Sequence, residues 1–337
     1  MELGGDMKII TNRIIKEIFT YSIKFISLLL AVSVITFALV SASPIDPVQQ
    51  YIIGLGTAVS PEQRAEIEDY WGVNEPPAER YFGWLSEVLH GNLGESALYR
   101  RPVADIIGER FLNSLALMLC AWILSGVTGF VLGCIMGMYR DRLPDRILKR
   151  ICYIISSVPT FWLGMVFLLV FSVWLKWFPI GFSAPIGMLS SDVTIRQKLY
   201  HLILPAFTLS LMSFANIALH TRQKLSDVLS SDYVLYAKAR GEGKWTILRR
   251  HGFRNILIPA LTLQFASFAE LFGGSVMAEN VFSYPGLGSA VAAAGLNSDV
   301  PLLLGVTLFS ALFVGVGNMI ANLLYGVIDP QIENGGK

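Results

Sequence analysis

Long apolar runs alternate with short charged segments along this chain. A helix of about 20 residues crosses an apolar layer about 30 Å thick, and each run is long enough to do so. The pattern predicts six spans, at about 21–41, 113–138, 152–177, 201–222, 256–277 and 301–324. We therefore expect an all-α membrane protein with six transmembrane helices.

The composition supports this expectation. Of 337 residues, 53% are hydrophobic and only 15% are charged, whereas about a quarter are charged in soluble proteins. A net charge of +1 provides no field that would attract nucleic acid. Membrane lipid is therefore the expected partner of the apolar runs. Cys120, Cys134 and Cys152 lie in or beside apolar runs without metal-ligand spacing, which predicts small core residues.

The sign of the loop charges predicts the topology. Residues 44–110 carry eleven acidic and five basic side chains, whereas residues 139–150 carry five basic and two acidic ones. Residues 222–254 carry eight basic and three acidic ones. Because basic loops stay in the cytoplasm, we expect a multi-pass protein of the cytoplasmic (inner) membrane with both termini cytoplasmic. Run 21–41 exceeds the 7–15 residues of a signal-peptide core, so we expect a retained span and keep cleavage as the rival.

Three regions follow from this order. Residues 1–41 hold an N-terminal segment and the first span, and residues 42–112 form an external region with a helical insertion. There, Ser60-Pro61-Glu62-Gln63 is a capping-box start, and a second helix is expected at 78–90. Residues 113–337 form a five-helix core that includes a cytoplasmic loop at 222–256, between the fourth and fifth spans.

Two local patterns predict helix packing. Gly129, Gly133 and Gly137 recur at four-residue spacing on one face of the second span, which lets another helix approach closely. The stretch Ser156-Ser157-Val158-Pro159-Thr160 predicts a local kink in the third span.

The stretch from Asp232 to Pro259 is polar and basic between apolar runs. Ser231 or Asp232 is placed to cap a short helix that ends at Gly241 in the left-handed conformation. Ala237 and Ala239 leave one helix face shallow. Residues 244–251 predict a second short helix, so that two helices stand out of the membrane. A phosphate-binding loop is excluded because Lys238 and Trp245 occupy the positions that need Gly and Ser or Thr.

This stretch resembles the EAA loop of ATP-binding-cassette importer permeases, in particular the dipeptide, oligopeptide and nickel branch. The matching residues are Asp232, Tyr233, Ala237, Ala239, Gly241, Leu248, Arg250, His251, Arg254, Asn255 and Pro259, with Arg240 beside Gly241. One departure is Gly241-Glu242-Gly243, where the branch usually has Gly-Leu-Ser and a Ser cap. Similar signatures run from about Phe25 to Ile332, nearly the whole chain.

The resemblance implies a permease subunit whose loop docks into an ATPase. ATP and Mg²⁺ would be held on two separate ATPase subunits, so this chain would bind no cofactor and would not be an enzyme. A second homologous permease and an external solute-binding protein are also implied. Residues 113–337 would be the permease core. No catalytic or metal-binding residue is expected, and His90, His201, His220 and His251 are too dispersed to form a metal site.

Glu270 is the one full charge within the fifth span, past its midpoint. Because a charge in mid-membrane costs about 2.5–3.5 kcal/mol on insertion scales and usually faces a cavity, Glu270 is a candidate pathway residue for attracting the ammonium end of a short peptide. A bond to a neighbouring helix is the structural alternative. A nickel or metal-chelate importer remains the alternative function. A secondary transporter is disfavoured because no repeat of the spans and no chain of ionisable residues is visible.

Overall fold

The computed structural model describes the backbone of residues 3–42, 48–49, 52, 59–70, 75–188 and 192–328. Within these residues the regular structure is helical, apart from one antiparallel pair of two-residue strands, β1 (Glu95–Ser96) and β2 (Arg101–Pro102). Four described helices are long and apolar enough to cross a membrane, and up to six spans result if each of two bent helix pairs counts as one. The predicted helical membrane fold is confirmed.

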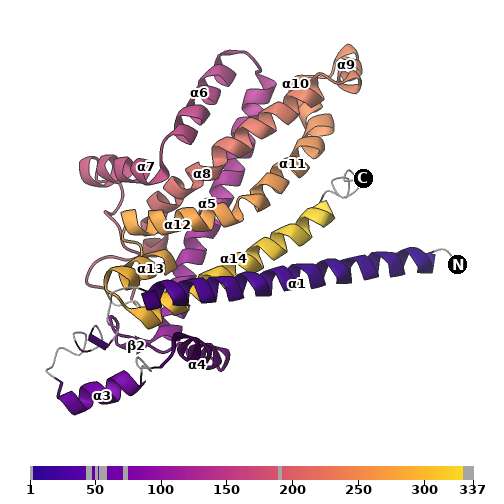
Figure 1. Ribbon diagram of the computed structural model, residues 1–337. Helices are drawn as coiled ribbons and strands as arrows, with labels where there is room; N and C mark the ends of the chain where they lie inside the picture. Colours follow the sequence, from indigo (N-terminus) through magenta and orange to yellow (C-terminus); the bar gives the residue numbers. More distant parts are fainter. Residues whose placement is uncertain are drawn as a thin grey trace. The chain divides into compact units, whose positions relative to one another are not determined.

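The chain divides into two compact units, which are described separately. The first comprises residues 1–109 and 290–319. It contains α1 (Leu3–Ala42), α3 (Pro61–Tyr70), α4 (Pro77–Leu89), the strand pair and most of α14 (Val300–Ile328) (Figure 1). The predicted capping box is present at α3: the Ser60 N–H donates to Gln63 Oε1 at 2.9 Å, and the Gln63 N–H donates to Ser60 Oγ at 3.2 Å.

A buried carboxylate joins the strand pair to α14. Asp299 Oδ2 accepts from the Ser96 hydroxyl at 2.5 Å and from the Leu98 N–H at 2.9 Å. Its Oδ1 accepts from the Leu302 N–H at 3.2 Å, in the first turn of α14. Asp299 therefore caps α14 and fixes the external strand pair to its start.

The second unit comprises residues 110–289 and 320–337. Its helices are α5 (Val103–Met138), α6 (Leu143–Ser157), α7 (Thr160–Phe167), η1 (Leu168–Trp174), α8 (Ile195–Leu229), α9 (Asp232–Ala239), α10 (Lys244–Ile247), η2 (Leu248–Gly252), α11 (Phe253–Ala266) and α12 (Phe268–Val281). Helix α13 (Leu287–Leu296) begins in this unit, and the sequence analysis did not predict it. Helix α8 is central, since α6, α7, α11 and α12 all contact it (Figure 1).

The predicted glycine seam packs against α8. A Cβ added to Gly129, Gly133 or Gly137 would lie only 2.5–2.9 Å from the nearest α8 atom. Those atoms belong to residues from Phe214 to Leu225, one helical turn after another. Because any side chain at these positions would push the helices apart, the glycines allow α5 and α8 to lie in close contact.

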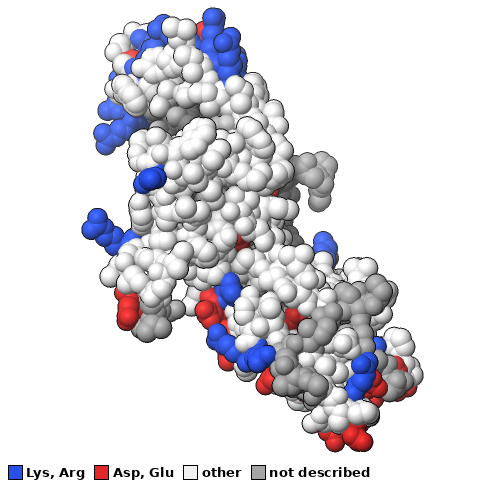
Figure 2. Space-filling view, turned by 90° about the vertical axis from the view of Figure 1, so that its left-hand side faces the viewer, with Lys and Arg blue, Asp and Glu red and all other residues white. Residues whose placement is uncertain are grey.

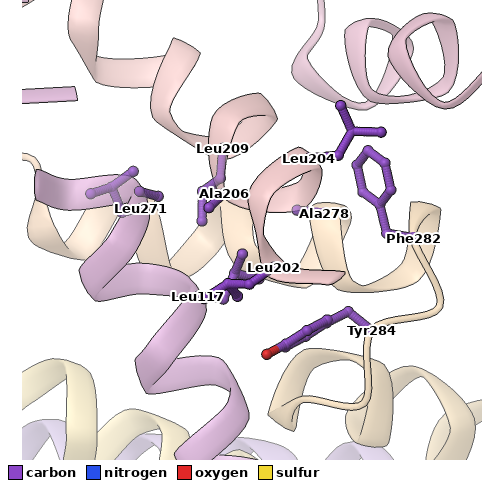
Figure 3. Packing of buried hydrophobic residues seen from close by; sticks show 10 residues of the cluster. Leu117, Leu202, Leu204, Ala206, Leu209, Leu271, Ala278, Phe282 and Tyr284 are labelled. Carbon is purple, nitrogen blue, oxygen red and sulfur yellow. The ribbon is translucent and has the colours of Figure 1, made fainter. Parts of the chain in front are cut away.

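Figure 3 shows the apolar cluster at the other end of α8. Leu117 from α5, Leu202, Leu204, Ala206 and Leu209 from α8 and Leu271 and Ala278 from α12 are buried together with Phe282 and Tyr284. These side chains come from segments more than 150 residues apart in sequence. The cluster therefore holds α5, α8 and α12 together.

Two of the predicted spans are bent by more than 40°. The segment predicted as one span at 152–177 is made of α6 and the α7–η1 helix, which meet at 106° around Val158 and Pro159. The expected local kink is thus a sharp turn, because Pro159 supplies no N–H and starts a new helix. The fifth span is bent by 50° at Ser267.

The second short cytoplasmic helix predicted at 244–251 is not separate. Residues 244–266 form one continuous helix that includes α10, η2 and α11, and Pro259 lies inside it. The prediction of a separate helix was wrong because we assumed that a membrane-spanning helix does not extend into basic sequence. Within the loop at 222–256, α9 is the short helix that is separate from the longer helices.

Candidate coupling site

Helix α9 ends as its sequence predicts. Gly241 has a φ of +84°, and its N–H donates to the Lys238 carbonyl at 2.9 Å. The Glu242 N–H donates to the Ala237 carbonyl at 3.1 Å, which completes a Schellman motif. A Cβ on Gly241 would meet nothing within 4 Å. Glycine is therefore favoured there by its backbone conformation and not by lack of space.

One side of α9 is buried and the other is free. Val234 and Ala237 pack with Ile247 of α10, whereas Leu235, Tyr236 and Ala239 are exposed. Of the two alanines expected to form a shallow docking face, only Ala239 lies on the surface. Ala237 instead allows α9 to pack closely on α10. Arg240 extends over the Tyr236 ring, with 6.0 Å between its Cζ atom and the ring centroid.

Polar contacts tie α9 to the helix that follows. The Asn255 amide donates to the Tyr233 hydroxyl at 3.2 Å and to the His251 carbonyl at 2.9 Å. The Tyr233 ring lies 6.1 Å from the His251 ring, centroid to centroid. The structure thus brings together Tyr233, His251 and Asn255, which the resemblance had linked only by sequence.

The Glu242 side chain points toward η2 at the turn that departs from the usual Gly-Leu-Ser. Its carboxylate lies 3.5 Å from His251 Nε2 and 3.9 Å from Arg250 Nη1. Gly243, at the start of α10, has no side-chain cap. The carboxylate therefore lies beside basic residues but does not take the place of the Ser cap.

A buried ion pair fixes the end of α8 that leads into α9. Arg222 donates from Nε to Asp145 Oδ1 at 2.5 Å and from Nη2 to Asp145 Oδ2 at 2.7 Å. Asp145, in the first turn of α6, has no exposed surface, and the Arg222 side chain is 12% exposed. This bidentate geometry is the strongest form of carboxylate recognition by arginine.

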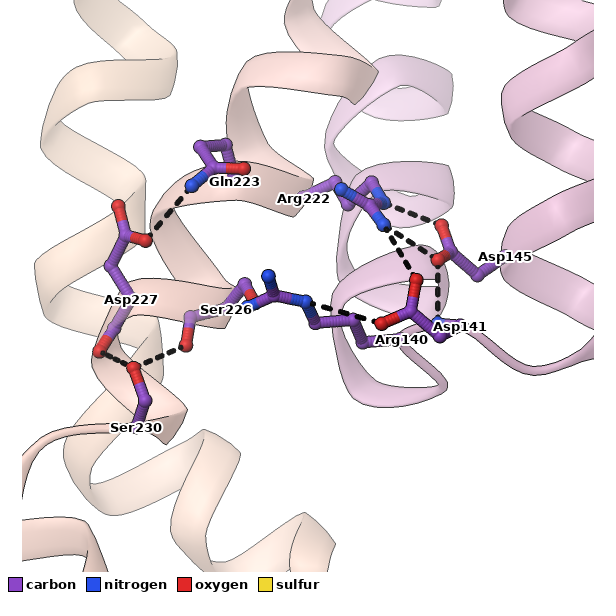
Figure 4. Close-up of polar contacts among 8 residues, drawn as sticks. All are labelled: Arg140, Asp141, Asp145, Arg222, Gln223, Ser226, Asp227 and Ser230. Atoms are coloured by element: carbon purple, nitrogen blue, oxygen red, sulfur yellow. Dashed lines mark hydrogen bonds and ion pairs between the residues drawn. The ribbon is translucent and has the colours of Figure 1, made fainter.

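The connection between α5 and α6 joins the same cluster (Figure 4). Asp145 also accepts from the Asp141 N–H at 2.8 Å. Arg140 donates to the Ser226 hydroxyl and lies 3.6 Å from the exposed Asp141 carboxylate. The α5–α6 connection, α6 and α8 therefore meet in this cluster, and the α8 members, Arg222 and Ser226, lie ten or fewer positions before α9. The sequence analysis used these charges only to predict the topology. Two acidic residues four positions apart in a basic loop, Asp141 and Asp145, could have indicated a cluster of charged contacts.

Basic side chains gather around this site. Figure 2 views the side of α6 and α7 and shows Lys and Arg clustered at the end of the second unit where α5 connects to α6, next to a surface almost free of charge. The eight basic residues from Arg222 to Arg254 belong to this region. The distribution matches the predicted basic loop beside a membrane span.

Glu270 lies just after the bend in the fifth span. It is exposed in the first turn of α12, and no hydrogen bond or ion pair joins it to the residues that the structure describes. The bend itself is stabilised by polar groups: the Gln264 carbonyl accepts from Ser267 Oγ and Trp122 Nε1, both at 2.8 Å. The expected alternative, a bond from Glu270 to a neighbouring helix, has no support in the described part of the chain.

A second carboxylate, missed by sequence reasoning, is fully buried at the far end of α12. Glu279 accepts from the Ser114 hydroxyl at 2.6 Å and from the Ser289 N–H at 3.0 Å. The same Ser114 oxygen accepts from the Leu287 N–H at 2.7 Å. Gly286 lies directly against the carboxylate, and a Cβ there would collide with it. The Glu279-to-Gly288 stretch is thus a structural joint between α5, α12 and α13.

Among the residues that the structure describes, no group of three or more His, Cys, Asp or Glu side chains is placed to hold a metal ion. The three cysteines are free, with Cys152 buried and the other two partly buried. The arrangement presents one short exposed helix, α9, beside buried polar contacts between longer helices, in a chain with several candidate membrane spans.

Comparison with known families gives the class. Residues 129–334 match the model of the binding-protein-dependent transport system inner membrane component, and residues 14–118 match the N-terminal model of the same kind of membrane component. The first match alone covers more than half of the chain. This chain belongs to the family of binding-protein-dependent inner-membrane transport components, and the predicted membership is confirmed.

Similar proteins cover the whole length. The oligopeptide transport system permease protein AppB of Bacillus subtilis (strain 168) is 33% identical over 309 residues, which are 91% of this chain and 96% of AppB. A putative peptide transport system permease protein of Brucella abortus (strain 2308) is 33% identical over 314 residues, 91% of this chain and 96% of the relative. The glutathione transport system permease protein GsiC of Escherichia coli O6:H1 is 33% identical over 327 residues, 96% and 99% of the two chains.

The family determines the coarse role. The chain is a multi-pass permease of the inner membrane that works in a binding-protein-dependent system. Its family function is transport and not catalysis, as predicted, and no cofactor on this chain is expected from that role. None of the three relatives named above has nickel in its name.

Proposed function

We propose that this chain is the permease subunit of an ATP-driven importer that moves short peptides across the cytoplasmic membrane. The relatives named for peptide, oligopeptide and glutathione transport support the substrate class. The observation that carries the mechanism is α9, a short exposed helix held on a basic surface by buried contacts with its neighbours.

In this proposal α9 docks into one of two ATPase subunits, which hold ATP and Mg²⁺. A second homologous permease completes the pore, and an external solute-binding protein delivers the peptide. When the ATPases close, they push on Tyr236 and Ala239. Because Val234 and Ala237 are packed against Ile247, the push reaches the continuous helix 244–266 without an intervening flexible joint.

The proposal places both termini and α9 in the cytoplasm. A cysteine at Glu87→Cys, on an exposed position of α4, should react in intact cells with a membrane-impermeant thiol reagent. A cysteine at Gly243→Cys should react only after the cells are opened. Labelling of Gly243→Cys in sealed cells would contradict this orientation.

The coupling role is tested at the exposed end of α9. The combined change Ala239→Glu and Gly241→Asp should abolish uptake and ATPase stimulation while the subunit still inserts, because a charge enters the docking face and Gly241 alone has positive φ in this turn. Gly243→Asp is the matched control, since Gly243 has a φ of −73° and open space around it. Uptake at the normal rate in the double variant would make α9 a simple connector.

The substrate is tested with the intact transporter. Labelled dipeptides should be taken up and compete with one another, whereas nickel, with or without a small chelator, should not accumulate. Glu270→Gln should lower peptide uptake if this exposed carboxylate attracts the peptide ammonium group. Nickel accumulation without peptide uptake would replace the proposed substrate. Unchanged uptake by Glu270→Gln would remove Glu270 from the pathway but leave the permease assignment intact.

A further inference from the structure

Helix α4 has two chemically different sides. At 100° per residue, Ala78, Phe82, Leu85 and Leu89 form one apolar stripe. Tyr81 and Trp84 extend the apolar side in one direction around the helix. Glu79 and Glu87 lie on the polar side and are exposed. Such a division is typical of a helix that lies along a boundary between water and an apolar phase.

Tyr81 and Trp84 attach α4 to α1. The Tyr81 and Ser33 hydroxyl oxygens lie 2.8 Å apart. The Phe37 ring lies 5.4 Å from the Tyr81 ring and 5.9 Å from the Trp84 ring, centroid to centroid. Ser33 is 3% exposed, so this attachment is a packed contact. It fixes the position of α4 along the axis of α1.

The α1 residues that contact α4 lie within the part of α1 that could cross a membrane. The apolar part of α1 that could cross a membrane is Ser22–Ala42. At about 1.5 Å per residue, Phe37 and Ser33 lie about 7 Å and about 13 Å before its end. An apolar layer is about 30 Å thick. Tyr81 therefore reaches well below the membrane surface, and α4 cannot stand clear of the membrane in water.

Two large side chains of the apolar stripe next to this attachment are exposed. Phe82 is 66% exposed and Leu89 is 79% exposed. Val34, Ile35 and Leu39, on the same stretch of α1, are also exposed. The uncovered stripe of α4 is thus beside the exposed apolar side chains of a helix that could cross a membrane. Glu87 is on the opposite side of α4, and Glu79 is about a quarter turn from the stripe.

We propose that α4 is an interfacial helix, with Ala78, Phe82, Leu85 and Leu89 inserted among the acyl chains of the membrane leaflet next to it. Leaving Phe82 and Leu89 in water would forgo the burial free energy of two large apolar side chains. The depth set by Ser33 and Phe37 makes lipid the partner at that level. The helix thereby anchors the external region to the plane of the membrane and braces the end of the first span.

The test uses nitroxide spin labels in the complete transporter, reconstituted in vesicles of phosphatidylcholine and phosphatidylglycerol. Cys120, Cys134 and Cys152 are first changed to Ser, and single cysteines are then introduced as Phe82→Cys, Leu89→Cys, Glu79→Cys and Glu87→Cys. Collision rates with oxygen, which concentrates in lipid, and with a water-soluble nickel chelate are measured by power saturation. Uptake by each variant shows that the transporter is folded.

Labels at 82 and 89 should collide often with oxygen and rarely with the chelate, and labels at 79 and 87 should show the reverse. Frequent chelate collisions at all four positions would place α4 in water and overturn the proposal. Protection of 82 and 89 from both reagents would overturn it in favour of a protein partner. If the cysteine-free background is inactive, the same four cysteines are labelled in the native-cysteine protein, and the signal of the native-cysteine protein without an introduced cysteine, labelled in the same way, is subtracted.

Discussion

Two carboxylates of the second unit are fully buried, and they are held in different ways. Asp145, close to α9, binds the guanidinium of Arg222 through both oxygens. Glu279, near the other end of α5, receives a hydroxyl and a backbone N–H. One is therefore balanced by an opposite charge and the other by neutral donors. The first contact needs two side chains to remain together, whereas the second depends mostly on the fold of the backbone around it.

The two kinds of contact fit their positions in the fold. The Asp145–Arg222 pair connects α6 to α8 ten residues before α9, and in the proposed mechanism it would transmit force between these helices. The Glu279 contacts connect α5, α12 and α13 at a turn that Gly286 keeps tight. A charge pair resists separation strongly because each partner alone would remain buried and unpaired.

The largest effect is expected from Asp145→Ala. This change leaves Arg222 buried without its partner, which costs about 3–5 kcal/mol in comparable sites. The free energy of unfolding of the purified complex should fall by that amount, with loss of uptake. Asp141→Asn is the control: Asn tolerates the left-handed backbone of Asp141, whose φ is +60°, and the carboxylate that is lost is 70% exposed in the same cluster and should contribute no more than about 1 kcal/mol. Equal losses in the two variants would contradict the comparison.

A smaller effect is expected from Glu279→Gln. The amide keeps one acceptor oxygen but places an NH₂ group near the Ser289 N–H or the Ser114 hydroxyl, which costs about 1–3 kcal/mol. Glu109→Gln, at an α5 carboxylate whose side chain is 58% exposed, is the control and should change stability little. A loss from Glu279→Gln as large as that from Asp145→Ala would show that the nature of the partner does not matter.

The smallest effect is expected from neutralising both partners. Asp145→Asn combined with Arg222→Gln leaves no buried charge, so most of the stability lost by Asp145→Asn alone should return. A double-mutant cycle on the unfolding free energy measures this coupling. Strictly additive losses would show that the two side chains do not act as a pair.

Sequence patterns predicted the features that depend on local spacing. The Gly129 seam follows from four-residue periodicity, and the Gly241 helix end from the need for positive φ. The buried pairs could not be predicted, because Asp145 and Arg222 are 77 residues apart and only packing against α8 brings them together. For the same reason the burial of Glu279 could not be predicted, since its partner Ser114 is 165 residues away. The turn of 106° at Pro159 depends on where α7 finds its packing partners.

The coupling role stays a prediction for every candidate residue: Asp232, Tyr233, Ala237, Ala239, Arg240, Gly241, Arg250, Asn255 and Pro259. Asp232 begins α9, Arg240 follows its last turn, and Pro259 lies within α11. Their roles toward a partner need an experiment with that partner present. The same holds for Glu270.

The most direct test of the account asks what touches α9. A photoreactive benzoylphenylalanine placed at Tyr236, which is 66% exposed, is irradiated in the intact transporter and the adducts are identified by mass spectrometry. The same group at Trp162, exposed at 49% on α7, serves as the control. The account predicts a covalent adduct between position 236 and an ATPase subunit, with none to an ATPase from position 162. Absence of an ATPase adduct at 236 in an actively transporting complex would contradict it.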